Sequence, residues 1–190
     1  MTRIVAGVWS GRRLITPAGS ATRPTGEKVR AALGNSLSAG GALAGARVLD
    51  LYAGSGALAL ELLSRGAAAA DLVENDRAAL AAARRNVGSL QAAGARVVAA
   101  DVHRFVAGLA AAGAGTQRYD VVVADPPYVV PGAELTALFG QLQAAGALAG
   151  GADLVIERPV RGGEPDWPEP LVGVRSRRYG DTLLCYGRAP

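Results

Sequence analysis

Short apolar segments alternate with amphipathic segments along residues 46–190. The apolar segments have the length of strands, and the segments between them place apolar residues at helical spacing. The expected strands lie at 48–52, 71–74, 96–100, 119–124 and 153–157. The expected helices lie at 58–65, 102–109 and 135–142, and between Asp76, which caps a helix, and Gly94, which stops it. This alternation predicts an α/β fold with a parallel sheet and helices on both of its faces.

Beyond residue 158 the pattern changes to that of an antiparallel hairpin. Two apolar segments, 172–175 and 182–186, flank a turn at Tyr179-Gly180-Asp181. Glycine and aspartate are favoured in turns that connect neighbouring antiparallel strands. We therefore expect this hairpin to extend one edge of the sheet.

The first 42 residues, called the leader below, follow a separate pattern. Segments 4–8 and 12–15 predict a hairpin that turns near Ser10-Gly11. A helix should follow, with Thr25 as its N-cap and Gly40-Gly41 at its end. Its buried face should carry Val29, Leu33 and Leu37. We expect a single domain over 1–190, in which the leader is an extension and residues 46–190 form the core.

Positive charge is concentrated in the leader. The chain has 20 basic and 16 acidic residues, a net charge of +4, but residues 1–30 alone carry a net charge of +5. A basic extension on a near-neutral core is typical of a segment that binds a polyanion such as RNA. The alternative is a solvated basic surface, and charge alone does not separate the two. The candidate RNA-binding residues are Arg12, Arg13, Arg23 and Arg30.

Composition excludes several classes of protein. Half of the 190 residues are apolar and 19% are charged, as in globular domains and unlike disordered chains. The single cysteine, Cys185, excludes an internal disulfide framework, and with one histidine, His103, it offers no cluster of metal ligands. No segment approaches the roughly 20 apolar residues of a membrane span, and no signal peptide is visible. We expect a cytoplasmic protein with no metal and no membrane contact.

A glycine-rich segment follows the first core strand and indicates a nucleotide site. Glycines there let the backbone approach a ligand, which binds at the carboxyl ends of parallel strands. Glu74 ends the second strand, where it can accept hydrogen bonds from both ribose hydroxyls, and Asp101 ends the third, where it can accept from an adenine amine. The predicted cofactor residues are Asp50, Tyr52, Gly54, Ser55, Gly56, Glu74, Asn75, Asp101 and Val102. This pattern alone also fits a nicotinamide dinucleotide.

The segment Asp125-Pro126-Pro127-Tyr128 at the end of the fourth core strand narrows the chemistry. Consecutive prolines give a stiff turn with exposed carbonyl groups. Tyr128 offers a face on which a base can stack, while Asp125 and the Pro126 carbonyl can accept the two hydrogens of an exocyclic amine. Held in this way, the nitrogen can direct its lone pair at a sulfonium methyl group. We therefore predict Asp125, Pro126 and Tyr128 as catalytic residues of a methyltransferase.

Over its whole length the chain resembles the bacterial small-subunit rRNA guanine-N2 methyltransferases, which have the Rossmann-like class I S-adenosylmethionine fold. The residues that carry the resemblance are Arg3-Ile4-Val5-Ala6-Gly7, Arg23-Pro24-Thr25, Val29-Arg30, residues 49–56, Asp125-Pro126-Pro127-Tyr128 and Tyr179-Gly180-Asp181-Thr182. The resemblance implies a seven-stranded sheet whose last strand is antiparallel. It also implies S-adenosylmethionine as cofactor and one guanine of 16S rRNA as substrate, methylated in 30S assembly particles with ribosomal proteins. We expect the protein to be a monomer.

Two features leave alternatives open. The leader helix has Ala31 and Gly34 where family members usually carry an acidic and an aromatic residue. An RNA-binding assembly factor with the same fold but without turnover is therefore one alternative. The other is an enzyme that methylates adenine N6 or glutamine N5, since these enzymes share the proline-proline-tyrosine motif.

Overall fold

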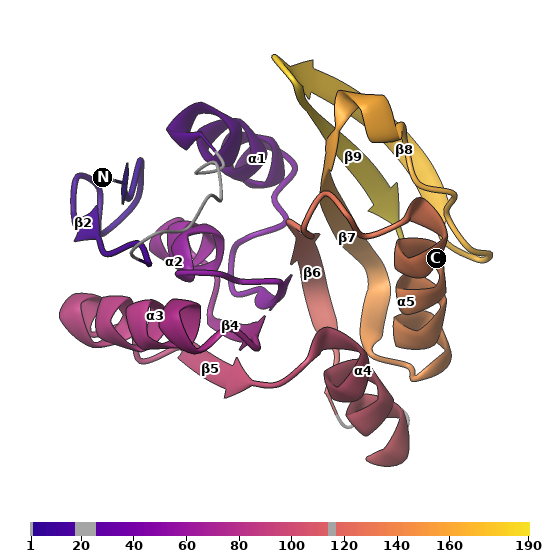
Figure 1. Ribbon diagram of the computed structural model, residues 1–190, viewed down its shortest axis with the longest axis horizontal. Coiled ribbons are helices and arrows are strands. Elements are labelled where there is room, and N and C mark those ends of the chain that lie inside the picture. The colour runs from indigo at the N-terminus through magenta and orange to yellow at the C-terminus, as the bar shows by residue number, and fades with distance from the viewer. Residues whose placement is uncertain (1, 18–25, 114–116) are drawn as a thin grey trace.

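The computed structural model of the protein describes residues 2–17, 26–113 and 117–190 (Figure 1). Its centre is a seven-stranded sheet. From one edge to the other the strands are β5 (Ala95–Ala99), β4 (Ala69–Glu74), β3 (Arg47–Leu51), β6 (Tyr119–Ala124), β7 (Leu148–Pro159), β9 (Thr182–Arg188) and β8 (Val172–Tyr179). The first five run parallel, whereas β9 is antiparallel to both β7 and β8. The predicted seven-stranded sheet with an antiparallel last strand and an edge hairpin is thus confirmed.

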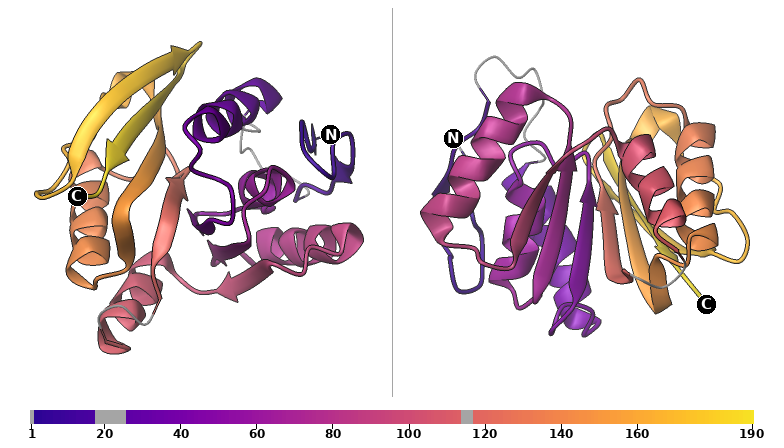
Figure 2. Two further views of the ribbon diagram at one scale, coloured as in Figure 1. Left: turned by 180° about the vertical axis from the view of Figure 1, so that it is seen from behind. Right: turned by 90° about the horizontal axis from the view of Figure 1, so that it is seen from below.

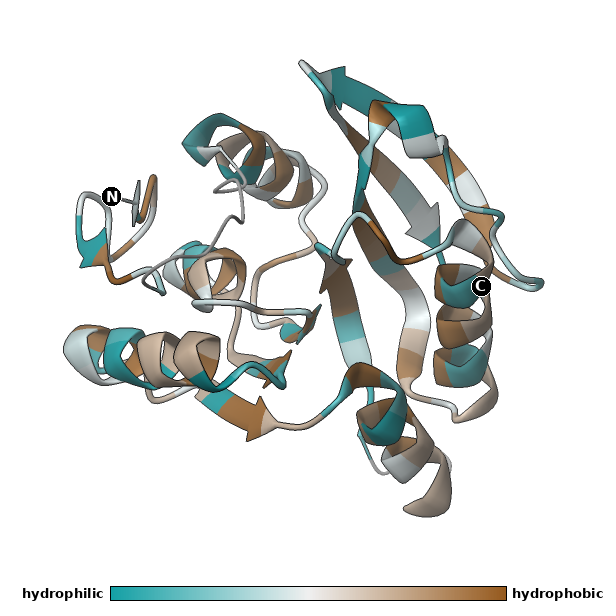
Figure 3. Cartoon of the chain, viewed as in Figure 1, coloured by the Kyte–Doolittle hydropathy of each residue, from teal (hydrophilic) through white to brown (hydrophobic). Residues whose placement is uncertain are grey.

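Helices cover both faces of this sheet, as the sequence pattern predicts (Figure 2). Their bounds are α1 (Glu27–Ala39), α2 (Ala57–Ser64), α3 (Arg77–Leu90), α4 (Val102–Ala111) and α5 (Gly132–Ala144), with a 3-10 turn, η1 (Val160–Gly162), after β7. Because successive side chains of a strand point to opposite faces, Val48 joins the core under α1 and α2, and Leu49 joins the core under α4 and α5. Both faces are buried, so the central strands are mostly apolar (Figure 3).

The leader forms a smaller hairpin than the sequence predicts. Only two residues of each strand pair, in β1 (Thr2–Arg3) and β2 (Arg13–Leu14), while the expected strand at 4–8 is a loop. The loop follows the surface of α2, where Gly7 has a φ of +86° and an added Cβ would lie 1.8 Å from the Ser64 carbonyl oxygen. This close approach requires glycine and replaces strand pairing.

Two helix ends also differ from the sequence prediction. The N-cap position of α1 is Gly26, which makes no side-chain capping bond, and the expected cap, Thr25, lies outside the described residues. Asp76 caps α3 as predicted, accepting from the Ala79 N–H, but α3 ends at Leu90 rather than near Gly94. Gln91 ends it with a left-handed φ of 52°, a conformation that the sequence pattern does not signal.

Candidate active site

The ends of the parallel strands place polar side chains in one row. A register of paired residues crosses four strands through Val73, Leu51, Ala124 and Ile156. The next residue along each of these strands is therefore at the same edge of the sheet: Glu74, Tyr52, Asp125 and Glu157. The first three are predicted site residues, so the structure brings the cofactor and catalytic candidates together.

The glycine loop between β3 and α2 is held in a shape that needs its glycines. Gly54 and Gly56 have positive φ values of 56° and 78°. An added Cβ at Gly56 would lie 2.6 Å from a methyl carbon of Leu72 in β4, so the loop can pack onto the sheet only without a side chain there. Tyr52 also has a positive φ, 63°, which is a strained conformation for a bulky residue and is typical of functional sites. α2 begins directly after the loop.

Asp50 supports this loop from below. It is 1% exposed, and its Oδ2 accepts a hydrogen bond of 3.0 Å from the Ala59 N–H in the first turn of α2. Burial raises the pKa of the Asp50 carboxyl to about 8, and the charges of Asp125 and Glu74 act in the same direction, against the bond from Ala59. Because it is buried under the loop, Asp50 fits a role in positioning the loop rather than in touching a ligand.

Glu74, the last residue of β4, forms a hydrogen bond with the backbone of the loop that follows β3. Its Oε2 accepts from the Gly54 N–H at 2.8 Å, and its Oε1 accepts from the N–H groups of Asn75 and Asp76 at 2.7 and 2.8 Å. A carboxylate has about four acceptor positions, so these bonds leave about one for a ligand in this arrangement. Glu74 therefore both shapes the glycine loop and presents an acceptor beside it.

Asp101 lies two residues beyond the end of β5, next to the row, and Tyr52 lies within the row between Glu74 and Asp125. Asp101 Oδ1 caps α4 by accepting from the N–H groups of His103 and Arg104, at 3.0 and 3.1 Å, and the next residue, Val102, is buried. His103 Nε2 lies 2.8 Å from Glu134 Oε1 in α5. Burial raises the pKa of Tyr52 to about 12, and the charges of Glu134 and Asp101 add to the effect. The Tyr52 hydroxyl is therefore neutral over the physiological pH range.

The segment from Asp125 to Tyr128 leaves the end of β6 and opens to solvent. Asp125 is partly buried and Pro126 is buried, whereas Tyr128 is 51% exposed. The turn closes through a hydrogen bond of 2.9 Å from the Val130 N–H to the Pro127 carbonyl. This order places an acceptor at the strand end and an accessible aromatic face beyond it.

Two residues at the end of β7 belong to this site but were not predicted as site residues. Glu157 lies next to Asp125 in the row and is 7% exposed. Arg158 is 4% exposed, and its Nη1 donates to the Val130 carbonyl at 2.9 Å, which fixes the far end of the turn that begins at Asp125. The strand-end position of Glu157 was a readable signal, whereas the bond from Arg158 spans 28 residues and has no sequence signature.

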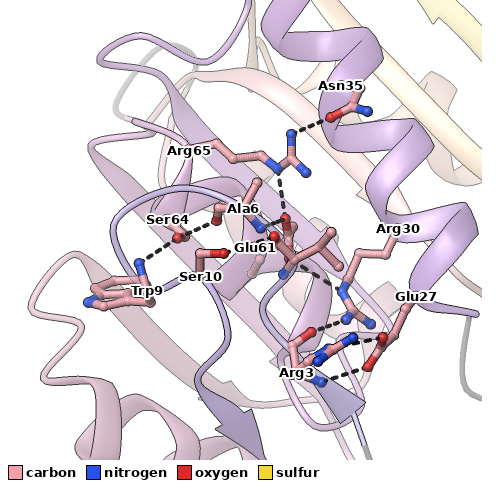
Figure 4. Close-up of polar contacts among 12 residues, drawn as sticks. Arg3, Ala6, Trp9, Ser10, Glu27, Arg30, Asn35, Glu61, Ser64 and Arg65 are labelled. Carbon is pink, nitrogen blue, oxygen red and sulfur yellow. Dashed lines mark hydrogen bonds and ion pairs between the residues drawn. The ribbon is translucent and has the colours of Figure 1, made fainter.

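The leader is docked on α2 through a buried ionic network (Figure 4). Glu61 is fully buried and accepts from the N–H groups of Val5 and Ala6, at 2.7 and 3.1 Å, and from Arg65 Nε at 2.7 Å. Arg30 Nε lies 3.7 Å from Glu61, and Arg30 also donates to the Arg3 carbonyl. The sequence did not predict this role for Glu61.

The predicted RNA-binding residues therefore fall into three groups. Arg30 is 2% exposed, so its prediction as an RNA contact is wrong: its guanidinium serves to hold the leader against α2. Arg12 and Arg13 are exposed, and Arg12 also donates to the Ser89 carbonyl at 2.8 Å. Arg23 lies outside the described residues.

Gly34, one of the two departures from the family pattern, has a structural reason. An added Cβ at this buried position in α1 would lie 2.6 Å from Arg65 Nε. The glycine makes room for the Arg65 guanidinium, which bonds to Glu61 and to Asn35 Oδ1. The leader helix remains packed, because Val29, Leu33 and Leu37 are all buried as predicted.

Comparisons with known proteins show the family of this chain. The family model described as Conserved hypothetical protein 95 matches residues 2–188. The Ribosomal RNA small subunit methyltransferase D of Escherichia coli K12 is 39% identical over 166 residues, which cover 87% of this chain and 79% of that protein. The chain belongs to the family of this model, and the Escherichia coli methyltransferase is one of its relatives.

Two further members extend the likeness over almost the whole chain. The Bacillus subtilis protein named "Putative rRNA methyltransferase YlbH" is 33% identical over 187 residues, 95% of each chain. The solved structure titled "Putative methyltransferase yhhF from Escherichia coli" is 33% identical with a TM-score of 0.83, and covers 99% of this chain and 98% of that one. The predicted class I methyltransferase fold is thereby confirmed.

Two absences concern only the described residues. No helix in these ranges combines the length and the apolar character that a membrane span needs. Within the same ranges, no three His, Cys, Asp or Glu side chains are grouped so that they could hold a metal ion.

Proposed function

We propose that this family member transfers the methyl group of S-adenosylmethionine to the exocyclic N2 of one guanine in 16S rRNA. The observation that carries the proposal is the strand-end row. It places Asp125, at the head of an exposed aromatic turn, in register with Glu74 and the glycine loop. An amine acceptor, a base-stacking face and a nucleotide-type loop are thus adjacent.

The residues of the row fit S-adenosylmethionine. Gly54 has no side chain, and an added Cβ there would lie in open space, so the backbone of the loop is accessible to a ligand at this position. Glu74 has an acceptor position for a ribose hydroxyl, while Asp101 and Val102 provide a polar and an apolar contact for adenine. We assign the loop before α2 and Tyr52 to the methionine part of the cofactor, because both directly follow β3. When bound, S-adenosylmethionine supplies an electrophilic methyl group on a sulfonium.

The chain's own residues act on the acceptor amine. Tyr128 stacks against the guanine, and the two N2 hydrogens donate to the Asp125 carboxylate and the Pro126 carbonyl. These bonds direct the nitrogen lone pair toward the methyl group. As the N–C bond forms and the bond between the methyl carbon and the sulfonium sulfur breaks, positive charge develops on N2, which then loses one of its protons. The Asp125 carboxylate opposes that charge and can accept the proton.

We propose the exposed side of the leader as the contact for the rRNA backbone. Arg12 and Arg13 are exposed beside the hairpin turn and supply positive charge, whereas the core has a net charge of −1. The surrounding partners, ribosomal proteins of a 30S assembly particle, and the monomeric state of the enzyme are part of the same proposal.

The test uses unmethylated small subunits and free 16S rRNA from a strain that lacks this activity. Each is incubated with the protein and S-adenosylmethionine, and the rRNA nucleosides and the peptides of the ribosomal proteins are analysed by mass spectrometry. We expect N2-methylguanosine at one position. N6-methyladenosine would show that the substrate is adenine. Methylation of protein glutamine alone would show that it is a protein. Binding of rRNA without any methyl transfer would support the assembly factor without turnover.

The Glu74→Ala variant should bind S-adenosylmethionine more weakly while it remains folded. The substitution removes a ribose acceptor and leaves the Gly54 N–H without its partner, and unmatched polar groups of this kind cost about 1–3 kcal/mol, or roughly 5- to 150-fold in Kd. Titration calorimetry measures the effect. Asp76→Ala is the matched control, because it removes a nearby carboxylate that caps α3 and should leave the affinity unchanged. Equal affinities in Glu74→Ala and the wild type would exclude Glu74 as the anchor.

The Arg12→Ala/Arg13→Ala double variant should depend less on salt when it binds rRNA. Each phosphate contact contributes about one unit to the slope of log affinity against log salt, so the slope should fall by roughly one to two units. A filter-binding salt series measures it. Arg177→Ala/Arg178→Ala removes the same charge from the exposed β8 strand and is the control. A slope that changes only in that control would move the RNA contact to the β8–β9 hairpin.

A further inference from the structure

One fully buried side chain connects the leader to the glycine loop. Asn86 lies in α3 and has 0% exposure. Its Oδ1 accepts from the Ile15 N–H at 2.8 Å, and its Nδ2 donates to the Ile15 carbonyl at 2.9 Å. The same Nδ2 donates its other hydrogen to the Ser55 carbonyl at 2.9 Å. Asn86 therefore contacts the backbone just after β2 and the backbone of the cofactor loop at the same time.

The bonding of this amide is well defined. A primary amide has two donor hydrogens, and both are used here, on two different segments. The pair of bonds to Ile15 imitates the backbone pairing of a β-strand, so displacement of Ile15 must move or break the Asn86 amide. Because a buried donor that loses its acceptor is costly, the positions of Ile15 and Ser55 are energetically linked.

The α2 side chains that bind the leader make no such second hydrogen bond to the glycine loop within the described residues. Ser64 Oγ donates to the Ala6 carbonyl at 2.7 Å and accepts from the Trp9 N–H at 3.0 Å, which fixes the leader on the last turn of α2 (Figure 4). Glu61 binds the leader from the second turn of α2. Ser64 is 2% exposed, so it matches Asn86 in burial and in leader contacts, but within the described part of the chain its side-chain hydrogen bonds go only to the leader.

We propose that Asn86 is a positioning residue that orients the Ser55 carbonyl of the cofactor loop and couples the leader to it. This inference rests on the proposed function, in which the leader grips rRNA and the loop holds S-adenosylmethionine. RNA that orders the leader then favours the loop geometry that binds the cofactor. By linkage, the cofactor strengthens RNA binding by the same factor.

The experiment measures binding of S-adenosylhomocysteine, which has no methyl group to transfer, by titration calorimetry with and without saturating 16S rRNA. The wild type should bind it about threefold or more tightly with rRNA. Asn86→Ala should raise the Kd without rRNA about threefold to tenfold and bring the rRNA effect close to one. Ser64→Ala, the matched control, should keep the wild-type Kd without rRNA and lose only affinity for rRNA.

A second variant guards against misfolding of Asn86→Ala. Ile15→Pro removes the N–H that donates to Asn86 but leaves the Asn86–Ser55 bond, on a side chain that is 46% exposed. It should keep the wild-type Kd without rRNA and weaken the rRNA effect. Two results would overturn the inference and leave the proposed function intact. One is folded Asn86→Ala with both the wild-type Kd and the wild-type rRNA effect. The other is Ile15→Pro with an undiminished rRNA effect. A wild type that binds neither ligand would overturn the proposed function itself.

Discussion

The Asp125→Ala variant should transfer methyl groups at least about 100-fold more slowly than the wild type in a single turnover, with little change in cofactor affinity. Its carboxylate is placed at the strand end, in register with Tyr52 and Glu74. In the proposed mechanism it opposes charge that develops on the amine only in the transition state, and loss of one such preorganised group costs about 100- to 1,000-fold in rate. Rapid-quench assays with excess enzyme measure the step directly.

Two variants on the same turn separate the causes of that loss. Asp125→Asn keeps an oxygen acceptor without the negative charge, so it should recover part of the rate. Tyr128→Ala removes the exposed stacking face and should mainly weaken RNA capture, by about 1–3 kcal/mol, at a smaller cost in the saturated rate. Single-turnover rates in Asp125→Ala that equal the wild type would remove Asp125 from the reaction.

The strand-end row was predictable from sequence because its information is local. Each of its polar residues ends a short apolar segment, and parallel strands bring their carboxyl ends to one edge. The order of the strands along that edge, which puts Tyr52 between Glu74 and Asp125, was not predicted and comes from the structure. Glu157 also ends a short apolar segment, but no recognised motif accompanies it, so it was not predicted as a site residue.

The leader network was not predictable because its information is long-range. Arg30 and Glu61 occupy helices in which a charged residue is ordinarily solvent-exposed, and their burial depends on partners 31 residues apart in the chain. Asn86 has the same property: its partners, Ile15 and Ser55, are 71 and 31 residues away. Charge counting therefore identified the leader as basic, but it counted Arg30, whose side chain is buried, among the exposed charges.

The other large effect concerns the stability of the fold as pH rises, and it comes from Asp50. The structure buries this carboxyl under the glycine loop and raises its pKa from 3.8 to about 8. An acid with a raised folded pKa binds its proton more tightly in the folded chain than in the unfolded one. Its stabilising contribution is complete below pH 4 and is lost as the pH rises through 8, because the unfolded chain releases the proton first.

The Asp50→Asn variant should therefore be more stable than the wild type at high pH, and the gain should grow between pH 4 and 8. Asparagine imitates the protonated acid: its oxygen can still accept from the Ala59 N–H, and it never ionises. Each unit of pKa shift corresponds to about 1.4 kcal/mol, so we expect a gain of at least about 1 kcal/mol at pH 8.5, or roughly 2–4 °C in Tm. Urea unfolding across this pH range measures it. Asp120→Asn is the control, since Asp120 also accepts a backbone N–H, from Arg47 at 2.8 Å, but is exposed. Parallel pH profiles for the wild type and Asp50→Asn would show that Asp50 stays ionised under the loop.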